Sequence, residues 1–238
     1  MLKFFKKSQP SSTSALPEDN LSSEQKEALN KQFAAVYEQE PNGQKAFEVA
    51  HQFAEQGSAD AQYLLGVMLE NGDGRNTYPE KAADYYYRAA KQDKAEAQYN
   101  LALLCMQDAL GKPDMLTAVH WFEQASENGI VQATYNLATC YDQGLGCVED
   151  KEAAFKAFCK AAEKSYTPAW QNVAVMLYQG EGCQRNPVES YAWTLLAAKA
   201  GIEEAQTMEK HLTQELKSEQ ILAGKDRLDA LVAKYMPN

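Results

Sequence analysis

The chain has 238 residues, of which 45% are hydrophobic and 24% charged, so it can bury a sizeable core and is neither collagen-like nor wholly disordered. Its 33 acidic residues outnumber its 23 lysines and arginines, which gives a formal net charge of −10. Binding to nucleic acid depends on cationic side chains that displace counterions from phosphates, so this charge argues against a nucleic-acid partner.

Residues 1–20 differ from the rest of the chain because they combine a basic start with a polar stretch. Residues 1–7 hold three lysines, two phenylalanines and a leucine, but neither the apolar core nor the cleavage site of a signal peptide. Residues 8–20 are mostly polar residues and proline, so we expect 1–20 to form a flexible tail. No later stretch approaches the ~18 consecutive apolar residues of a membrane span, and we expect a cytoplasmic protein.

Residues 21–60 predict a helical pair that diverges from the repeats that follow it. The first helix, 22–39, begins with Ser-Ser-Glu-Gln, a capping-box pattern. The second helix, 44–57, aligns at a distance of 36 residues with the second helix of the first clear repeat. We therefore interpret 21–60 as a degenerate first repeat.

Residues 61–204 contain four copies of a 36-residue unit without any insertion. Two positions of the unit hold alanine throughout, and a third holds leucine or valine. These positions are Ala61, Ala97, Ala133 and Ala169; Ala89, Ala125, Ala161 and Ala197; and Leu65, Leu101, Leu137 and Val173. A single helical pair cannot bury its apolar face alone, so the sequence predicts that neighbouring units stack.

Each unit predicts two helices joined by a turn. The first helix has apolar or small residues at i, i+4, i+7 and i+8, and in three units it ends at G-x-G, where glycine supplies the positive φ of a tight turn. The unit 97–132 has Asp108 and Leu110 in place of these glycines, so its turn must differ. The second helix begins at a capping residue, and in two units a proline follows at the first helical position. The turn glycines are Gly72 with Gly74, Gly144 with Gly146 and Gly180 with Gly182; the capping residues are Asp114, Asp150 and Asn186; the prolines are Pro79 and Pro187.

Residues 205–238 predict the C-terminal end of the array. The stretch 204–216 begins like another first helix. The stretch 218–235 is a longer amphipathic helix that is too irregular to be a repeat. We interpret 205–238 as C-terminal capping helices.

The unit A-x-x-x-L-G-x-x-x-x-x-G-x-G, followed by K-A-x-x-x-x-x-A-A, resembles the Sel-one-like repeat (SLR) family of bacterial-type, tetratricopeptide-like helical repeats. Residues 63–66, 72–74 and 81–90 carry the match best, and it covers about residues 44–216. The resemblance implies an all-α fold, a right-handed α-solenoid with a C-terminal capping helix. It also implies a protein–protein adaptor whose first helices line the concave side. Some secreted members of the family have a disulfide in each repeat, a pattern that this chain lacks.

The five cysteines are expected to be reduced or buried. Cys147 and Cys183 occupy equivalent turns of successive units, so they should lie ~8–10 Å apart, beyond the ~7 Å that a disulfide tolerates. Cys105, Cys140 and Cys159 fall on predicted helices, where a small buried apolar residue is the ordinary interpretation and a reactive thiol is the alternative.

Patterns that indicate catalysis or metal binding are missing from the sequence. The cysteines and the three histidines, His51, His120 and His211, lack the close spacing of a zinc site. No G-x-S-x-G, H-E-x-x-H or phosphate loop occurs, and the recurring G-x-G turns precede helices without a strand, unlike a dinucleotide fingerprint. We expect no enzyme activity, no cofactor and no metal.

One face of the first helices has the composition of a recognition surface. At 100° per residue, positions 63, 67 and 70 point away from the apolar side that centres on Ala61 and Leu65. Tyrosines, aliphatic residues and a methionine on such a face are typical of protein-binding surfaces. The alternative is that a tightly curved solenoid packs these side chains against the next repeat. The positions hold Tyr63, Val67 and Glu70; Tyr99, Leu103 and Met106; Tyr135, Thr139 and Asp142; Gln171, Val175 and Tyr178.

Amide side chains line one flank of the same face. They are Asn100 with Gln107, Asn136 with Gln143 and Asn172 with Gln179. An amide offers a donor and an acceptor together, so stacked asparagines can hold the backbone of an extended peptide. The alternative, favoured by the resemblance because asparagine is usual at this place in SLR repeats, is that they bind a neighbouring helix.

The leading functional hypothesis is a non-enzymatic adaptor that binds a partner protein or extended peptide on its concave face. Because the face positions hold no lysine or arginine, we expect a basic or neutral ligand rather than an acidic one. The alternative is a membrane-surface tether or regulatory scaffold that uses residues 1–7, although these residues offer only weak attraction to anionic lipid. The oligomeric state stays open. The residues expected to contact the partner are Tyr63, Tyr99, Asn100, Leu103, Gln107, Tyr135, Asn136, Gln143, Asn172, Tyr178 and Gln179.

Overall fold

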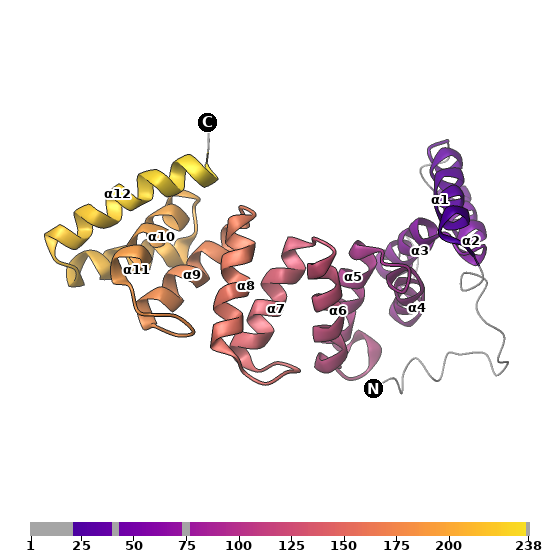
Figure 1. Cartoon of the computed structure of the whole chain (residues 1–238). Coiled ribbons are helices and arrows are strands. Elements are labelled where there is room, and N and C mark those ends of the chain that lie inside the picture. The colour runs from indigo at the N-terminus through magenta and orange to yellow at the C-terminus, as the bar shows by residue number, and fades with distance from the viewer. Residues whose placement is uncertain (1–20, 40–42, 73–76, 237–238) are drawn as a thin grey trace. The chain divides into compact units, whose positions relative to one another are not determined.

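The computed structural model describes residues 21–39, 43–72 and 77–236, and throughout these ranges the fold is all-α, without strands, as predicted (Figure 1). Residues 1–20, which include the expected tail and the basic start of the tether hypothesis, lie outside the described residues, and so does Gly74. The described elements are α1 (Ser23–Tyr37), α2 (Gly43–Glu55), α3 (Ala59–Asn71), α4 (Pro79–Ala90), α5 (Ala95–Met106), the short 3-10 helix η2 (Asp108–Leu110), α6 (Met115–Glu127), α7 (Val131–Gln143), α8 (Lys151–Glu163), α9 (Thr167–Gln179), α10 (Pro187–Lys199), α11 (Glu203–Glu215) and α12 (Ser218–Tyr235).

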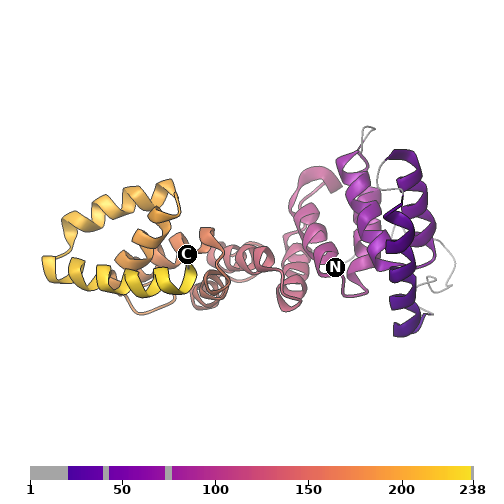
Figure 2. The ribbon, with the colours of Figure 1, turned by 90° about the horizontal axis from the view of Figure 1, so that it is seen from above.

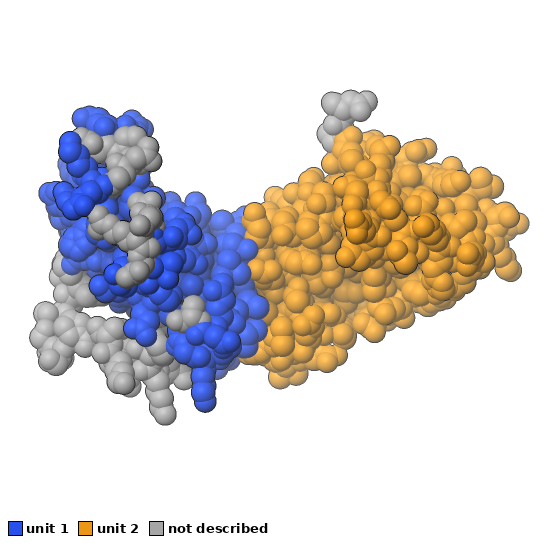
Figure 3. All heavy atoms as spheres, turned by 180° about the vertical axis from the view of Figure 1, so that it is seen from behind, with its two compact units in different colours: residues 1–130 blue, residues 131–238 orange. Residues whose placement is uncertain are grey.

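The chain divides into two compact units, residues 1–130 and residues 131–238 (Figure 3). The boundary falls between Ile130 and Val131, just before α7. The division that we expected from the repeats, with a tail, a degenerate repeat, four repeats and capping helices, stays a prediction.

Consecutive helices pack as pairs within each unit, and their order can be followed in Figure 2. In unit 1, α3 packs on α4 and α5 on α6, while α2 contacts α3 and α4 contacts α5. In unit 2, α7 packs on α8 and α9 on α10, and α8 contacts α9. We name α3, α5, α7 and α9 the A helices and α4, α6, α8 and α10 the B helices.

The predicted helix starts are confirmed. Asp114, Asp150 and Asn186 each accept a hydrogen bond from the backbone N–H three residues later, which satisfies a donor that the first helical turn leaves free. Ser22 and Gln25 form the predicted capping box of α1. Tyr78 precedes α4 without a side-chain cap, and there Pro79 alone marks the start.

The turns between A and B helices follow the glycine pattern. Gly180 and Gly182 have φ values of +77° and +66°, in the left-handed region where a side chain is strained. In the unit without these glycines the chain instead forms η2 and turns at Gly111, so the predicted difference is confirmed.

Two alanine ladders set the spacing of the helices. All five alanines of the first ladder and all four of the second have 0% exposure, so no larger side chain fits there without moving a helix. Close backbone approach at these positions lets leucines and aromatic rings of the same units fill the space between the helices. The ladders are Ala61, Ala97, Ala133, Ala169 and Ala205, and Ala89, Ala125, Ala161 and Ala197.

A recurring hydrogen bond links three of the A helices, α3, α5 and α9, to the helix that precedes each of them. Gln62 Nε2 donates to the carbonyl of Ala54 at 3.1 Å, and Gln98 Nε2 donates to the carbonyl of Ala90 at 3.2 Å. At the equivalent place in unit 2, Trp170 Nε1 donates to the carbonyl of Ala162 at 3.3 Å. Each bond satisfies a carbonyl at a helix C-terminus. Because the donors are two glutamines and a tryptophan, the sequence did not reveal that they play the same part.

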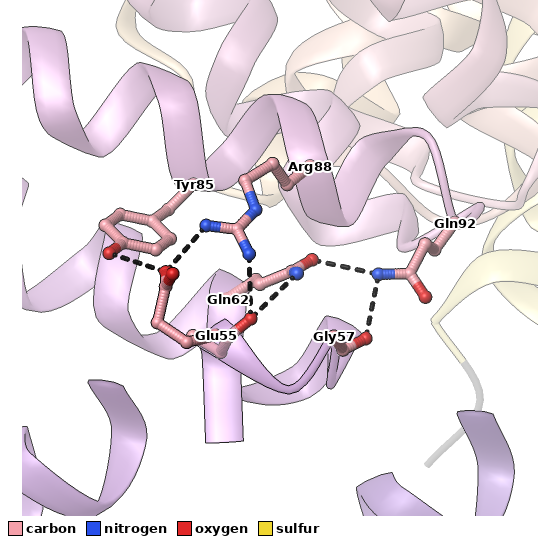
Figure 4. A network of polar contacts seen from close by, with 7 residues as sticks. Glu55, Gly57, Gln62, Tyr85, Arg88 and Gln92 are labelled. Atoms are coloured by element: carbon pink, nitrogen blue, oxygen red, sulfur yellow. Dashed lines mark hydrogen bonds and ion pairs between the residues drawn. The ribbon is translucent and has the colours of Figure 1, made fainter. Parts of the chain in front are cut away.

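In unit 1 this link is reinforced by an ion pair (Figure 4). Arg88 donates to Glu55 at 2.8 Å and to the carbonyl of Ala54 at 3.0 Å, while Gln92 donates to Gln62 at 2.9 Å. The Arg88 side chain is 8% exposed, whereas that of Glu55 is 51% exposed. The pair therefore ties α4 to the end of α2 with a buried cation and a solvated anion.

Acidification should weaken this ion pair. Partial burial opposes the charged form of Glu55, but the hydrogen bond and the charge of Arg88 outweigh it, so the pKa of Glu55 lies below its ordinary value of 4.5. A lowered folded-state pKa stabilises the fold above the unfolded pKa, and this contribution is lost as the pH falls through the folded pKa.

We expect Arg88→Met to reduce the drop in the urea midpoint between about pH 6 and about pH 3, measured by circular dichroism on the full chain. Lys156→Met, which removes an exposed ion pair with Glu152, is the control. An unchanged pH dependence in the Arg88 variant would contradict the assignment.

The C-terminal end of unit 2 is covered by α12. This helix packs along α10, and Gly224 lies so close to Tyr191 that an added Cβ would stand 2.7 Å from its ring. Leu231 and Tyr235 of α12 are buried against the core that contains Trp170 and Trp193. Helix α12 therefore shields apolar surface that a further repeat would otherwise cover.

Candidate protein-binding face

The predicted recognition surface is partly packed in the structure. All twelve face positions are half-buried, neither sequestered in the core nor fully exposed. On the flank, the three asparagines are half-buried and the three glutamines are exposed. We name these eighteen positions the A-helix face, and its parts on α3 and α5 and on α7 and α9 belong to unit 1 and unit 2 respectively.

Three tyrosines of the face each pack against an aromatic ring of the B helix in the same repeat. The ring centroid of Tyr63 lies 6.0 Å from that of Tyr86, and that of Tyr99 lies 6.0 Å from Phe122. In unit 2, Tyr135 makes an edge contact with Phe158 at 5.4 Å. Each tyrosine is thus held in place by a B-helix ring and keeps part of its surface open, as a rigid anchor for a partner requires.

In unit 1 the asparagine of the face is already occupied. Asn100 Nδ2 donates to the hydroxyl of Tyr86 at 3.2 Å. The Tyr86 hydroxyl donates to Glu70 at 2.7 Å. Burial of Tyr86, followed by its bond to Glu70, raises its pKa far above the ordinary value, so the hydroxyl remains a donor.

In unit 2 the equivalent amides are not occupied. Within the described part of the chain, neither Asn136 nor Asn172 forms a side-chain hydrogen bond. Asn172 sits where Asn100 sits in unit 1, but the residue that corresponds to Tyr86 is Phe158, which has no hydroxyl. Beside it, Oε1 of Gln171 is buried without a partner among the described groups. Unit 2 therefore presents polar groups whose hydrogen-bonding capacity is not used.

Tyr178 differs from the other tyrosines of the face because it belongs to a polar cluster with α11. Its hydroxyl donates to Glu215 and lies 3.1 Å from Nε2 of His211. Arg185 stacks over the ring at 5.2 Å and reaches Glu215 at 3.4 Å. The hydrogen bond to Glu215 raises the pKa of Tyr178. These contacts fix the ring at the end of α9.

The A helices contain no lysine or arginine, and their only acids are Asp60, Glu70, Glu96 and Asp142. Lysines from elsewhere pair with three of these acids. Lys94 lies 2.8 Å from Asp60 and 3.5 Å from Glu96, and Lys151 lies 2.9 Å from Asp142. Of the two acids on the A-helix face, Asp142 is therefore paired with a lysine, and Glu70 accepts a hydrogen bond from Tyr86.

The structure gives all five cysteines as free thiols. Burial raises the pKa of Cys105 and Cys159 to about 12 and that of Cys140 to about 11, so these thiols stay protonated and unreactive at neutral pH. Cys147 and Cys183 each donate to the carbonyl of the residue seven positions earlier. Their role in the turns is thus structural.

No group of three or more metal-ligating side chains comes together in the described ranges. Among the helices that the structure describes, none is both long and apolar enough to cross a bilayer.

Helical hairpins that recur every 36 residues define a helical repeat protein. The chain belongs to the Sel1 repeat family: residues 59–94, 95–130, 131–166 and 171–202 match the Sel1 repeat. Sel1 repeat proteins generally serve as scaffolds that bind other proteins, and the family is generally not enzymatic. The resemblance inferred from the sequence is confirmed.

Solved structures support the same fold. A Sel1 repeat protein from Oxalobacter formigenes is 24% identical, with a TM-score of 0.66, and the match covers 89% of this chain and 88% of that one. A protective antigen of uropathogenic Escherichia coli strains, which displays an SLR fold, is 25% identical with a TM-score of 0.52. That match covers 81% of this chain but only 49% of the antigen, so the present chain spans about half its length. No curated protein matched the chain.

Proposed function

We propose that this protein is a non-enzymatic adaptor that binds an extended segment of a partner protein along the A-helix face. The observation that carries the proposal is the combination of anchored tyrosines with unoccupied amides on α7 and α9. An extended chain presents unpaired backbone N–H and C=O groups, and an asparagine side chain can satisfy one of each. The membership in a family of interaction scaffolds supports this class of function.

The proposed contacts divide between the two units. In unit 1 they are Tyr63, Tyr99, Asn100, Leu103 and Gln107, and in unit 2 they are Tyr135, Asn136, Gln143, Asn172, Tyr178 and Gln179. The rings supply area that is buried at little entropic cost, because their packing already fixes them.

The partner segment is proposed to be neutral or basic. An acidic segment would need cations on the face, but the A helices have none, and Lys94 and Lys151 are already held by carboxylates. Hydrogen bonds and charge from Asp142 outweigh the partial desolvation of Lys151 and raise its pKa, so this lysine stays charged and paired. The remaining acid, Glu70, accepts from Tyr86.

We expect the double variant Tyr135→Ala/Asn136→Ala to lose at least tenfold in affinity for a captured partner, which corresponds to about 1.4 kcal/mol. Both side chains are half-buried on α7 and neither provides a helix cap, so the helical content should stay near that of the wild type. The measurement is surface plasmon resonance, with circular dichroism as the folding check.

Gln132→Ala is the matched control, because Gln132 is exposed on the same helix but outside the face. If the double variant keeps both its helicity and its partner affinity, the α7 part of the face does not bind the partner.

A further inference from the structure

The two units carry corresponding residues around the face asparagine, but the B-helix ring beside it has a hydroxyl only in unit 1. A shift of 72 residues relates Glu70, Tyr86 and Asn100 of unit 1 to Asp142, Phe158 and Asn172 of unit 2. In unit 1 the Tyr86 hydroxyl stands between two A helices, because it donates to Glu70 on α3 and accepts from Asn100 on α5. In unit 2 no hydroxyl is present at this position, and Asp142 is engaged by Lys151 at 2.9 Å instead.

The residue beside the B-helix ring also differs between the two units. An added Cβ at Gly66 would lie 2.6 Å from the ring of Tyr86, so only glycine lets that ring reach its place. The 72-residue counterpart of Gly66 is Ala138, which belongs to the same buried core cluster as Phe158. Glycine therefore accompanies the tyrosine that bonds Asn100, and alanine accompanies the phenylalanine that leaves Asn172 unbonded.

We infer that Tyr86, which reaches its place because residue 66 is glycine, holds Asn100 in a hydrogen bond, and we call this arrangement the lock. The lock confines backbone recognition of the partner segment to Asn136 and Asn172 of unit 2. This inference rests on the proposed function and narrows it. A peptide that used Asn100 would have to break its bond to the Tyr86 hydroxyl, whereas Asn172 has no side-chain hydrogen bond to a described group that would have to be broken. Tyr86 thus acts as a residue that determines specificity without touching the ligand.

The occupant is an extended, neutral or basic segment of a partner protein. The charge distribution argues for it, since α9 has no charged residue and α7 has only Asp142, which is paired with Lys151. An acidic segment would be a different outcome of the binding test described below.

The first test needs no ligand. In the free, full-length protein, the side-chain amide protons of Asn100 should exchange with water at least tenfold more slowly than those of Asn172, as followed by NMR of ¹⁵N-labelled protein. Tyr86→Phe should accelerate the exchange of Asn100 and leave that of Asn172 unchanged. Equal exchange of the two amides in the wild type would overturn the lock while leaving the proposed function intact.

The second test uses an array of capped synthetic octapeptides that contain lysine, arginine and uncharged residues but no aspartate or glutamate. Peptides retained by the wild type should bind Asn172→Ala at least tenfold more weakly, Asn100→Ala with a smaller loss, and Gln132→Ala, which lies outside the face, within a factor of two. An equal loss in Asn172→Ala and Asn100→Ala would overturn the inference. If no peptide of this array binds, or if only a matched array rich in glutamate binds, the proposed function fails and the inference with it.

A variant that introduces the glycine–tyrosine pair into unit 2 tests the inference most directly. The variant Ala138→Gly/Phe158→Tyr places in unit 2 the same pair that unit 1 has, and it should weaken peptide binding as much as Asn172→Ala does. Ala138→Gly alone is the matched control and should bind within a factor of two of the wild type. A transplanted variant that is folded, has slowed Asn172 amide exchange and still binds peptide normally would overturn the inference.

Discussion

Gly182→Ala should be among the most destabilising single substitutions in unit 2. An added Cβ would lie 1.9 Å from the carbonyl oxygen of Lys151 and 2.4 Å from its carbonyl carbon, and both are backbone atoms at the start of α8. The left-handed φ of +66° adds strain for any residue with a Cβ. Together these effects should lower the free energy of unfolding by about 3 kcal/mol.

Urea denaturation of the full chain measures this loss. The matched control is Gly129→Ala, where φ is +94° but nothing lies within 4 Å of the added Cβ. The control has only the backbone strain and should lose about 1 kcal/mol. Equal losses at the two positions would show that the turn is able to move away from α8.

Trp170→Ala should have an effect of at least the same size. Trp170 is 1% exposed, its ring centroid lies 6.1 Å from that of Tyr235, and its Nε1 donates to the carbonyl of Ala162. Removing so large a buried ring leaves a cavity between α9 and the capping helix α12, so we expect a loss of about 3–5 kcal/mol in the free energy of unfolding.

Trp170→Gln separates packing from hydrogen bonding at this site. Glutamine is the residue that Gln98 provides at the equivalent place, so it should restore the bond to the carbonyl and recover about 1 kcal/mol of the loss. Urea denaturation with tryptophan fluorescence and circular dichroism compares the variants. A loss below about 1 kcal/mol in Trp170→Ala would contradict a central role for this ring in the core.

The fold could be predicted because its determinants repeat. Glycine, proline and capping residues act locally through backbone geometry, so their positions alone indicated where helices begin and end. The alanine ladders were visible as a period of 36 because close helix contact excludes larger residues at the same place in every unit. Where the pattern changed, at Asp108 and Leu110, a changed turn was found.

The state of the binding face could not be predicted in the same way. The repeat placed Asn100 and Asn172 at equivalent positions, but whether each amide is occupied depends on a single oxygen atom of a residue fourteen positions earlier. The half-burial of the face positions depends likewise on how B-helix rings lean against them, as Phe122 and Phe158 do. Such contacts are set by side-chain geometry between elements, which periodicity does not contain.

The alanine ladders also govern which changes of length the protein can accept. One extra residue inside an A helix would rotate everything after it by 100°, so a buried alanine would be replaced by a bulky neighbour and a face tyrosine would turn inward. A residue added in an A–B turn causes no such rotation, and η2 already shows an altered turn between intact helices. Insertions should therefore accumulate in the turns during evolution. They would vary the edge of the scaffold while its helical register stays fixed.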